Sequence, residues 1–493
     1  MSFTSAIFII IFFPICTLSY FISDVKYRNI LLFILSCFFY AWCGLKFFLL
    51  LLISSTITYG LGLLIEKNVN EKIKKIFITL GITYSIGILF YYKYFFTILG
   101  GLNLTPFFTN SGFLDNFSSP ALPLGISFYV FSILSYLLDV YWQKCKAQKN
   151  IIYLYLYVLF FPKIVQGPIM RYGDFEPQLF KREMSISSID VGLQRFIIGM
   201  FKKVVIADQL SKIISYSFDH VDSVGTISSW LGIVAYLIQL YYDFSGYTDM
   251  AIGLGLMFGF KLPENFSYPY VSGTVAEYWR RWHISLGEWF RDYCYMPLYR
   301  AFIKNKRLKK CKNLTLYVDL LALILTWLLT GIWHGSGLKY IFYGLWWFVF
   351  IAIERIIEYH KKKIRKKNKI KNKKESMPEI IFHYSFTIIA VLFGQVIFRS
   401  ADLSIASAYV KNMLYWNTKD GWLFLLQLTN STLFAIVVGI IFSFPIFPVL
   451  KQKVIERNII TQIVYRIILA VIFFISFSYA ISAGYSPFLY QVF

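Results

Sequence analysis

The chain has few charged residues for its length. Only 15% of its 493 residues are Asp, Glu, Lys or Arg, and 57% are hydrophobic. A soluble domain has about 25% charged and about 45–50% apolar residues. At about 20 residues per membrane span, the apolar sequence suffices for about eleven to thirteen spans. This composition excludes a soluble enzyme with a tail anchor, a secreted disulfide scaffold and a disordered chain, and it predicts an all-α polytopic membrane protein.

Cysteine is also scarce, and its placement excludes two further kinds of site. The six cysteines lie in or beside apolar segments and show no paired spacing: Cys16, Cys37, Cys43, Cys145, Cys294 and Cys311. Disulfide scaffolds and zinc sites need such paired spacings. We therefore expect no disulfide and no zinc site. No other metal site and no bound cofactor are expected either.

Acidic residues are outnumbered by basic ones, 26 to 49, which gives a formal net charge of +23. In a soluble chain this excess would indicate nucleic-acid binding. Here it is concentrated in short loops between apolar segments, such as Lys361–Lys374, where ten of fourteen residues are Lys or Arg. Short basic loops stay cytoplasmic and attract anionic lipid headgroups. The expected partner of this charge is the lipid bilayer and not a nucleic acid.

The basic loops also predict the topology. Lys26 and Arg28 follow the first apolar run, Phe3–Tyr20, so the N-terminus should face out. The stretch Gly100–Ser119 has no Lys or Arg and should also lie outside. Continuing this count places the C-terminus outside. We expect one integral-membrane domain over 1–493, made of peripheral spans (1–120), a core with the site (121–357), a basic cytoplasmic loop (358–376) and C-terminal spans with an outside tail (377–493).

Several spans carry signs of interruption. Ile151–Gln166 is short and ends in QGP, which favours a broken or re-entrant element lined by protein or water. Trp230–Phe260 is expected to form two spans interrupted at Asp243–Gly246, whereas Trp422–Leu450 is expected to cross the membrane as one span.

The segment Thr274–Tyr295 is the first candidate site. Thr274 and Glu277 have the spacing of a capping box, so we expect one helix from Val275 to just before Pro297. Aromatic residues recur on one face of this helix, as in a helix lying in the membrane interface. His283 lies on that face, either as a structural histidine or as a site residue. The neighbouring Arg280 and Arg281 are expected to bind lipid headgroups or Glu277, with substrate as the alternative.

The segment Thr326–Gly337, TWLLTGIWHGSG, is the second candidate site. His334 stands among glycines, which permit close backbone approach and leave space around the ring. A neutral imidazole can accept a proton at one nitrogen while a partner holds the other, which suits a general base. The alternative is a hairpin turn with a hydrogen-bonded histidine. Of the other histidines, His383 is interpreted as structural, and His220 and His360 as loop residues.

A third stretch, Tyr241–Leu254, places Asp243, Ser245 and Asp249 in an apolar segment that contains glycine. Polar residues inside a membrane are costly, so a cluster of them is a site hypothesis. An unwound backbone at this segment could line a cavity, or the carboxylates could pair with Arg280 or Arg281 and hold helices together.

Five motifs in this order resemble those of the membrane-bound O-acyltransferase superfamily. They are LPLGISFYVFSILSYLLDVYW (Leu122–Trp142), QGPIMRYGDF (Gln166–Phe175), YYDFSGYTDMAIG (241–253), YWRRWHISLGEWFRDYCYMPL (278–298) and GIWHGSG (331–337). The likeness is strongest to the bacterial branch that O-acetylates alginate and peptidoglycan, and it covers nearly the whole chain. One departure is Ser132, where the family pattern has Gln, which affects the expected contacts of the tunnel.

The resemblance implies a ring of helices around a central tunnel, in the cytoplasmic (inner) membrane of a bacterium. It implies that His334 is catalytic, that His283 is the second signature position, and that Tyr490 near the C-terminus carries the acyl group. It also implies acetyl-CoA as the cytoplasmic donor and a periplasmic or surface esterase-like partner protein. The residues expected to contact substrate are Trp279, Arg280, Arg281, Trp282, Asp243, Ser245, Asp249 and Trp333.

The expected function is O-acetylation of a cell-envelope polysaccharide, most simply peptidoglycan. Alternatives within the family are O-acetylation of alginate or another exopolysaccharide and D-alanylation of teichoic acid. A transporter or flippase for an anionic precursor is the alternative from another class, because broken helices and buried charges are expected there too. The third class of function is a scaffold that only recruits a cell-wall enzyme.

Overall fold

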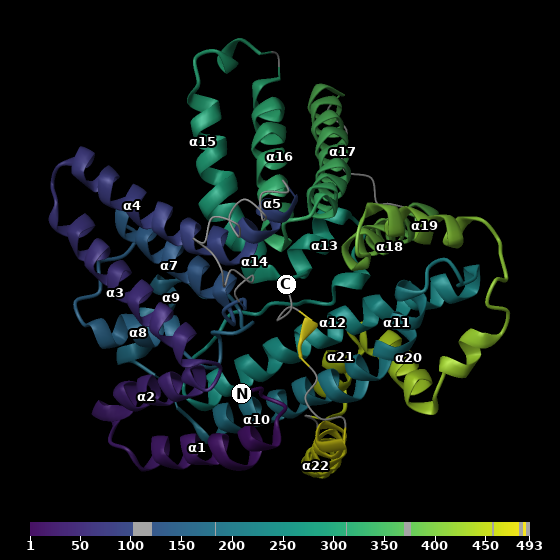
Figure 1. Ribbon diagram of the computed structural model, residues 1–493, viewed down its shortest axis with the longest axis horizontal. Helices are drawn as coiled ribbons and strands as arrows, with labels where there is room; N and C mark the ends of the chain where they lie inside the picture. Colours follow the sequence, from purple (N-terminus) through teal and green to yellow (C-terminus); the bar gives the residue numbers. More distant parts are fainter. Residues whose placement is uncertain are drawn as a thin grey trace, which may run out of the picture. The chain divides into compact units, whose positions relative to one another are not determined.

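The computed structural model describes residues 1–101, 121–182, 184–311, 313–368, 376–455, 458–482 and 487–489. Within these ranges the chain forms helices and loops without any β-strand, so the predicted all-α class is confirmed (Figure 1). The chain divides into two compact units. The first comprises Met1–Val204, Phe244–Glu264 and Ile468–Phe493, and the second comprises Val205–Asp243 and Asn265–Ile467.

The first unit contains the N-terminal helices. They are α1 (Phe13–Ile22), α2 (Arg28–Ala41), α3 (Leu45–Lys67), α4 (Glu71–Phe90), α5 (Phe96–Gly101), α7 (Ile126–Tyr141), α8 (Ile151–Leu159), α9 (Tyr172–Phe180) and α10 (Ile186–Phe201). Helix α7 packs closely on α3 and α4: a Cβ added at Gly81 would lie 2.6 Å from Leu137 Cδ1, and one added at Gly62 would lie 2.8 Å from the Tyr136 hydroxyl. A side chain at either glycine would have to displace these atoms, and nearly every residue of α7 is buried.

The second unit contains most of the C-terminal helices. They are α11 (Ser211–Asp219), α13 (Val275–Arg281), α14 (Ile284–Phe290), α15 (Met296–Lys304), α16 (Leu314–His334), α17 (Leu338–Asn368), α18 (Met377–Arg399), α19 (Leu403–Leu414), α20 (Asn430–Phe442) and α21 (Ile446–Lys453). Two helices contribute residues to both units, α12 (Thr226–Met257) and α22 (Ile459–Ser482).

Six helices of the described chain are long and apolar enough to cross a membrane, and the bent pair α20–α21 adds a seventh if it forms one span. The chain is therefore a multi-pass membrane protein. The sequence predicted about eleven to thirteen spans because its whole apolar content was assigned to spans of about 20 residues. Several of these runs form shorter helices. Helix α2, for example, has 14 residues, or about 21 Å at 1.5 Å per residue, against a hydrocarbon core of about 30 Å.

The predicted interruptions are partly confirmed. Helix α8 ends at Leu159 and a buried irregular segment follows it, as the QGP ending indicated. The break predicted at Asp243–Gly246 is wrong, because α12 runs unbroken through it. The single span predicted over Trp422–Leu450 is also wrong. There α20 and α21 are bent by 70°, and Pro445 lies at the bend, where it cannot continue α20.

The basic loop predicted over 358–376 is a helix for much of its length. Helix α17 continues to Asn368, since Lys and Arg are good helix formers and solvent surrounds them here. His360, interpreted as a loop residue, therefore lies in α17. The remaining residues of this segment, 369–375, lie outside the described chain.

Helices α16 and α17 form a hairpin and run side by side (Figure 1). Glycines on both helices allow this close contact. A Cβ added at Gly344 would lie 2.4 Å from the Trp327 carbonyl oxygen, and one added at Gly331 would lie 2.3 Å from the Tyr340 carbonyl oxygen. The two backbones therefore pack more closely than a side chain at either position would allow, which restrains the residues at the hairpin tip.

We expect Gly344→Ala to lower the thermal stability of the detergent-solubilised protein. The added methyl group would force α16 and α17 apart, and overpacking of this kind typically costs about 1–3 kcal/mol. Gly337→Ala is the matched control, because a Cβ at Gly337 would meet only Lys339 Cγ at 3.9 Å. Equal melting temperatures for the two variants, measured by fluorescence-detected size exclusion, would contradict the close packing.

Candidate functional site

The first candidate segment is a corner between two short helices. One helix was predicted from Val275, but α13 ends at Arg281 and α14 begins at Ile284. His283 at the corner has a φ of +46°, in the left-handed region that non-glycine residues rarely adopt. The prediction that the helix ends before Pro297 is also wrong. A π-helical turn follows α14, and Pro297 lies in the first turn of α15, where proline is tolerated.

Asn265 explains the corner. Its side-chain oxygen Oδ1 accepts hydrogen bonds from the backbone N–H of Ser285 (3.2 Å) and from Ser285 Oγ (2.9 Å), and its backbone carbonyl accepts one from Ile284 N (2.9 Å). All three donors lie at the start of α14, whose orphan N–H groups need partners. This asparagine, 18 residues before His283, therefore holds the first turn of α14 in place.

The same oxygen fixes the tautomer of His283. Asn265 Oδ1 lies 3.1 Å from His283 Nδ1. Because an amide oxygen only accepts, Nδ1 carries the proton and donates it. The basic nitrogen of the neutral ring is then Nε2. Burial lowers the pKa of the His283 imidazole to about 3, so the ring is neutral at physiological pH.

We expect acid to destabilise the protein through His283. The imidazole has a pKa of about 6.5 in an unfolded chain, so its stabilising contribution is complete above pH 6.5 and is lost as the pH falls toward 3. Between pH 7 and pH 5 the loss would be about 2 kcal/mol. His283→Asn, which tolerates the left-handed conformation, should lose less stability over the same range. Equal pH dependence of the two melting temperatures would contradict the buried neutral histidine, and exposed His360→Asn is the control.

The start of α13 is capped twice. Thr274 Oγ1 accepts from Glu277 N (3.0 Å), as the capping box predicted, but the Glu277 carboxylate accepts from Gly273 N and not from Thr274 N. The second cap is Glu354 of α17, whose carboxylate oxygens accept from Val275 N (2.6 Å) and Ala276 N (2.9 Å). A carboxylate suits the positive end of a helix. Sequence reasoning missed Glu354, although an acidic residue in an apolar span was a signal.

The two arginines differ in their surroundings. Arg281 forms an ion pair with Glu277 (2.8 Å), which was one predicted role, and its guanidinium also donates to the Ser267 carbonyl. Arg280 is exposed. The neighbouring tryptophans pack into aromatic clusters. Trp279 lies edge-on to Trp327 and Trp347, and Trp282 packs against Phe266 and Tyr278.

His334 is the last residue of α16 and is buried, with 3% of its surface exposed. Its ring is surrounded by three others: the centroids of Trp333, Phe398 and Tyr343 lie 4.6, 5.1 and 5.5 Å away. A histidine at the end of a helix can be enclosed either by a break in that helix or by side chains from other helices. Helix α16 is unbroken, and the enclosure comes from Tyr343 of α17 and Phe398 of α18.

Trp333 connects the two candidate histidines. Its ring centroid lies 4.6 Å from that of His334 and 6.4 Å from that of His283. The structure thus brings His283 close to Trp333 and His334, although it lies 50 residues before Trp333 in the sequence. A neutral imidazole can accept a proton at one ring nitrogen and donate one from the other. Two such rings beside one indole can therefore transfer protons in a site shielded from bulk water.

The residues of the third predicted stretch belong to different units. Asp249 and Ser245 belong to the first unit, whereas Asp243 belongs to the second; all three are buried or nearly so. The Asp249 carboxylate pairs with Arg195 (2.8 Å) and Lys202 (2.6 Å). The alternative that it pairs with Arg280 or Arg281 is therefore wrong, but its interpretation as a helix-joining ion pair is supported. Substrate contact by Asp243, Ser245 and Asp249 stays a prediction.

Two buried lysines in the first unit were missed by the sequence reasoning. Lys163 follows α8, and its Nζ donates to Ser132 Oγ (3.5 Å) and lies 4.4 Å from the Tyr157 ring centroid. Ser132, the departure from the family pattern, thus contacts a buried cation. Lys203 follows α10 and is 1% exposed. A lysine inside an apolar segment was the available signal for both.

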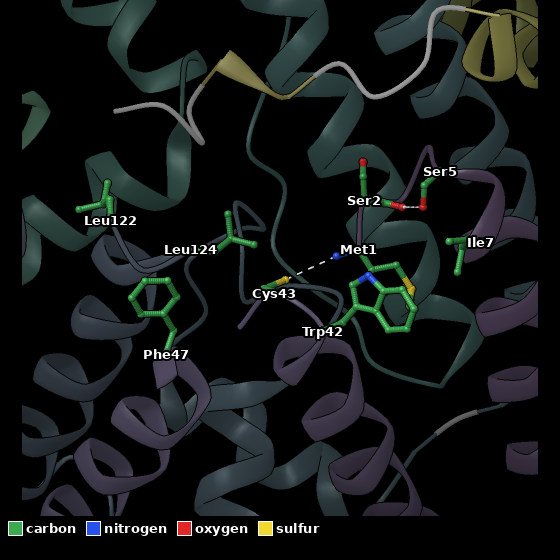
Figure 2. A pocket seen from close by; sticks show the side chains of 9 residues that line it. All are labelled: Met1, Ser2, Ser5, Ile7, Trp42, Cys43, Phe47, Leu122 and Leu124. Carbon is green, nitrogen blue, oxygen red and sulfur yellow. Dashed lines mark hydrogen bonds between the residues drawn. The ribbon is translucent and has the colours of Figure 1, made fainter. Parts of the chain in front are cut away.

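A cavity of about 410 Å³ opens at the N-terminus of the first unit. Figure 2 shows the side chains around it, mostly apolar, with the Met1 amine donating to Cys43 Sγ (3.5 Å). None of the predicted site residues lines it: the lining residues are Met1, Ser2, Ser5, Ile7, Trp42, Cys43, Phe47, Leu122 and Leu124. Tyr490, the predicted acyl carrier, lies outside the described residues, as does most of the predicted outside stretch Gly100–Ser119.

Comparison with known proteins assigns the chain to a family. The model of the membrane-bound O-acyltransferase family matches residues 143–394, which include both histidines. The chain is 37% identical to a probable alginate O-acetylase of Pseudomonas syringae pv. tomato, over 82% of this chain and 74% of that protein. It is 36% identical to the Pseudomonas aeruginosa counterpart, over 89% and 79% of the two chains. It is 31% identical to a peptidoglycan O-acetyltransferase of Helicobacter pylori, over 84% and 80%.

The matched region contains the α13–α14 corner and the α16–α17 hairpin, so the family assignment and the geometry concern the same residues. The chain therefore belongs to the membrane-bound O-acyltransferase family and is an O-acyltransferase of its bacterial O-acetyltransferase branch.

Proposed function

We propose that the protein takes acetyl groups from cytoplasmic acetyl-CoA and passes them across the membrane for O-acetylation of a cell-envelope polysaccharide. The observation that carries this proposal is the grouping of His283, Trp333 and His334 inside the region matched by the family. An O-acyl transfer needs a base for the acceptor hydroxyl and a site that excludes water. A buried histidine among aromatic rings supplies both.

In the proposed reaction His334 acts as the general base. The acceptor oxygen attacks the thioester carbonyl as its proton moves to the imidazole. A C–O bond forms, the C–S bond breaks, and the proton passes from His334 to the sulfur of the departing CoA. Tyr490 is the proposed first acceptor. Its acetyl ester is then transferred to a polysaccharide hydroxyl by the esterase-like partner outside the membrane.

This route requires a passage that both substrates can enter. We propose a central tunnel, with acetyl-CoA entering from the cytoplasm and both chain termini on the outer side of a bacterial cytoplasmic membrane. The distribution of Lys and Arg along the chain supports this orientation, because basic loops remain cytoplasmic. In this arrangement the donor never leaves the cytoplasm, and only the acetyl group crosses.

Two acceptors are proposed, and the relatives support both. Peptidoglycan is the acceptor named for the Helicobacter pylori relative at 31% identity. Alginate is named for the Pseudomonas relatives at 36–37% identity, which favours a second proposal, an exopolysaccharide of that kind. The chemistry at His334 is the same for both, because each offers a sugar hydroxyl. The acceptor is therefore selected by the partner protein rather than by the membrane site.

The test uses purified full-length protein in lipid vesicles with radiolabelled acetyl-CoA. We expect release of CoA and appearance of label on the protein or on an added acceptor. Binding of acetyl-CoA without turnover would overturn the transferase mechanism, and uptake of a labelled precursor into the vesicles would favour a transporter. Deletion of the gene, followed by analysis of O-acetyl groups on peptidoglycan and on exopolysaccharide, identifies the acceptor.

A further inference from the structure

The C-terminal tail is bound by a buried lysine of the first unit. Lys203 lies in the π-helical turn Lys202–Ala207 and is 1% exposed. Its Nζ donates a hydrogen bond to the Pro487 carbonyl (3.2 Å) and lies 4.5 Å from the centroid of the Phe488 ring. Burial of an ammonium group is costly unless it is compensated, and a carbonyl with an aromatic face provides part of that compensation.

The phenylalanine of the tail is enclosed. Phe488 is 0% exposed, and its ring lies edge-on to Tyr247 of α12, with centroids 4.9 Å apart. Tyr247 in turn stacks on Phe3, also at 4.9 Å. Lys203, Tyr247 and Phe3 come from three separate segments of the first unit, so the tail occupies a receptor built by its fold.

The receptor is rigid because α10 and α12 pack through two pairs of glycines. A Cβ at Gly199 would lie 2.6 Å from the Gly246 carbonyl oxygen, and one at Gly246 would lie 2.7 Å from the Gly199 carbonyl oxygen. Gly192 and Gly253 approach each other in the same way seven residues along each helix. Lys203 and Tyr247 are close in sequence to the first pair, so their backbones are held at a fixed separation.

The helix that precedes the tail is largely exposed. The buried residues of α22 are Leu469 and Ser476, so this helix offers little to hold the chain end. Phe488 is followed two residues later by Tyr490, at most about 7 Å of extended chain. Whatever holds Phe488 therefore limits where the Tyr490 hydroxyl can reach.

We propose that Lys203 and Tyr247 form a receptor that anchors Pro487–Phe488 and thereby positions Tyr490 for acyl transfer. This inference rests on the proposed function, in which Tyr490 carries the acetyl group. Lys203 is a positioning residue. It acts through the tail, and its charge and its aromatic contact hold the two residues before Leu489.

The first test measures how firmly the tail is held, without reference to activity. Full-length protein in vesicles is digested with carboxypeptidase, and trimming past residue 488 is followed by mass spectrometry. We expect Lys203→Met to accelerate this trimming about tenfold, because it removes one hydrogen bond and one cation–π contact. Lys203→Arg should restore much of the protection. Lys212→Met, at an exposed position of α11, is the control and should trim at the wild-type rate.

The second test measures transfer. Lys203→Met is expected to lower kcat for acetyl transfer about tenfold while the KM for acetyl-CoA stays unchanged, because the donor site is untouched. Phe488→Ala should reproduce both effects. It changes only the chain end, so it remains informative if Lys203→Met fails to fold.

The outcomes separate this inference from the proposed function. If Lys203→Met and Phe488→Ala trim and turn over as the wild type does, the receptor is overturned, even if Tyr490→Phe is inactive. If both variants trim faster but Tyr490→Phe transfers normally, the receptor stands as a tail anchor and the carrier role of Tyr490 is overturned. Faster trimming with slower transfer in both, and inactivity of Tyr490→Phe, supports the whole proposal.

Discussion

Replacing His334 with alanine is expected to abolish acetyl transfer to the polysaccharide. General-base assistance typically contributes about 10²–10⁴-fold to a rate, and no other histidine can replace the ring at this position. The ring of His283, the other candidate, lies on Trp333 with centroids 6.4 Å apart, and its Nδ1 is bound to Asn265. We would measure acetyl transfer from radiolabelled acetyl-CoA by the purified variant.

The His334→Ala variant should still insert into the membrane. The ring stands at the end of α16, and the hairpin is held by Gly331 and Gly344 further along the helices. Removing the ring leaves a cavity beside Tyr343 and Phe398, which lowers stability. His334→Gln fills more of that space without supplying a base, so its loss of activity isolates the chemistry from the packing.

His360 offers a matched control, since it is exposed on α17 of the same unit. His360→Ala should retain wild-type transfer. Normal transfer by His334→Ala, with expression equal to that of the control, would remove the general-base assignment. Loss of transfer in both variants would instead indicate general damage to the α16–α17 hairpin.

The sequence predicted the parts of this structure that depend on local pattern. Apolar runs predicted helices, the capping position of Thr274 predicted the start of α13, and the short apolar run ending in QGP predicted the broken element that follows α8. Each of these signals involves residues within a few positions of one another, where the sequence alone specifies the physical interaction.

The parts that could not be predicted depend on distant residues. The corner at His283 exists because Asn265 satisfies the start of α14, and nothing near His283 indicates a break. Gly246 was interpreted as the interruption of a span. It instead allows unbroken α12 to approach α10 at Gly199. A glycine in an apolar segment is compatible with an interrupted span and with close packing of an unbroken helix. Only the partner helix decides between the two.

The candidate site shows the same division. Motif order pointed to His283 and His334 and to the tryptophan between them in space. The surroundings that make His334 a buried residue come from α17 and α18, through Tyr343 and Phe398. No local pattern around GIWHGSG specifies those neighbours, so the depth of the histidine could not be read from the length of its helix.

Replacing Tyr490 with phenylalanine is expected to abolish O-acetylation of the polysaccharide, because this change removes the proposed acceptor hydroxyl and little else. The phenyl ring retains the size and apolar character of tyrosine, so an effect through packing should be small. O-acetyl groups on the polymer would be measured in cells, and mass spectrometry of the wild-type C-terminal peptide would detect acetyl-tyrosine. Tyr479→Phe in α22 is the matched control and should acetylate normally.

The size of this effect separates a carrier from an anchor. A tyrosine that only holds the tail in place would behave like Lys203, whose loss slows transfer about tenfold through one hydrogen bond and one cation–π contact. A nucleophile has no such residual route, because without its oxygen the acetyl group has nowhere to be attached before it leaves the site. Full transfer by Tyr490→Phe would therefore exclude the carrier, and a partial loss near that of Lys203→Met would reassign Tyr490 to the anchoring of the tail.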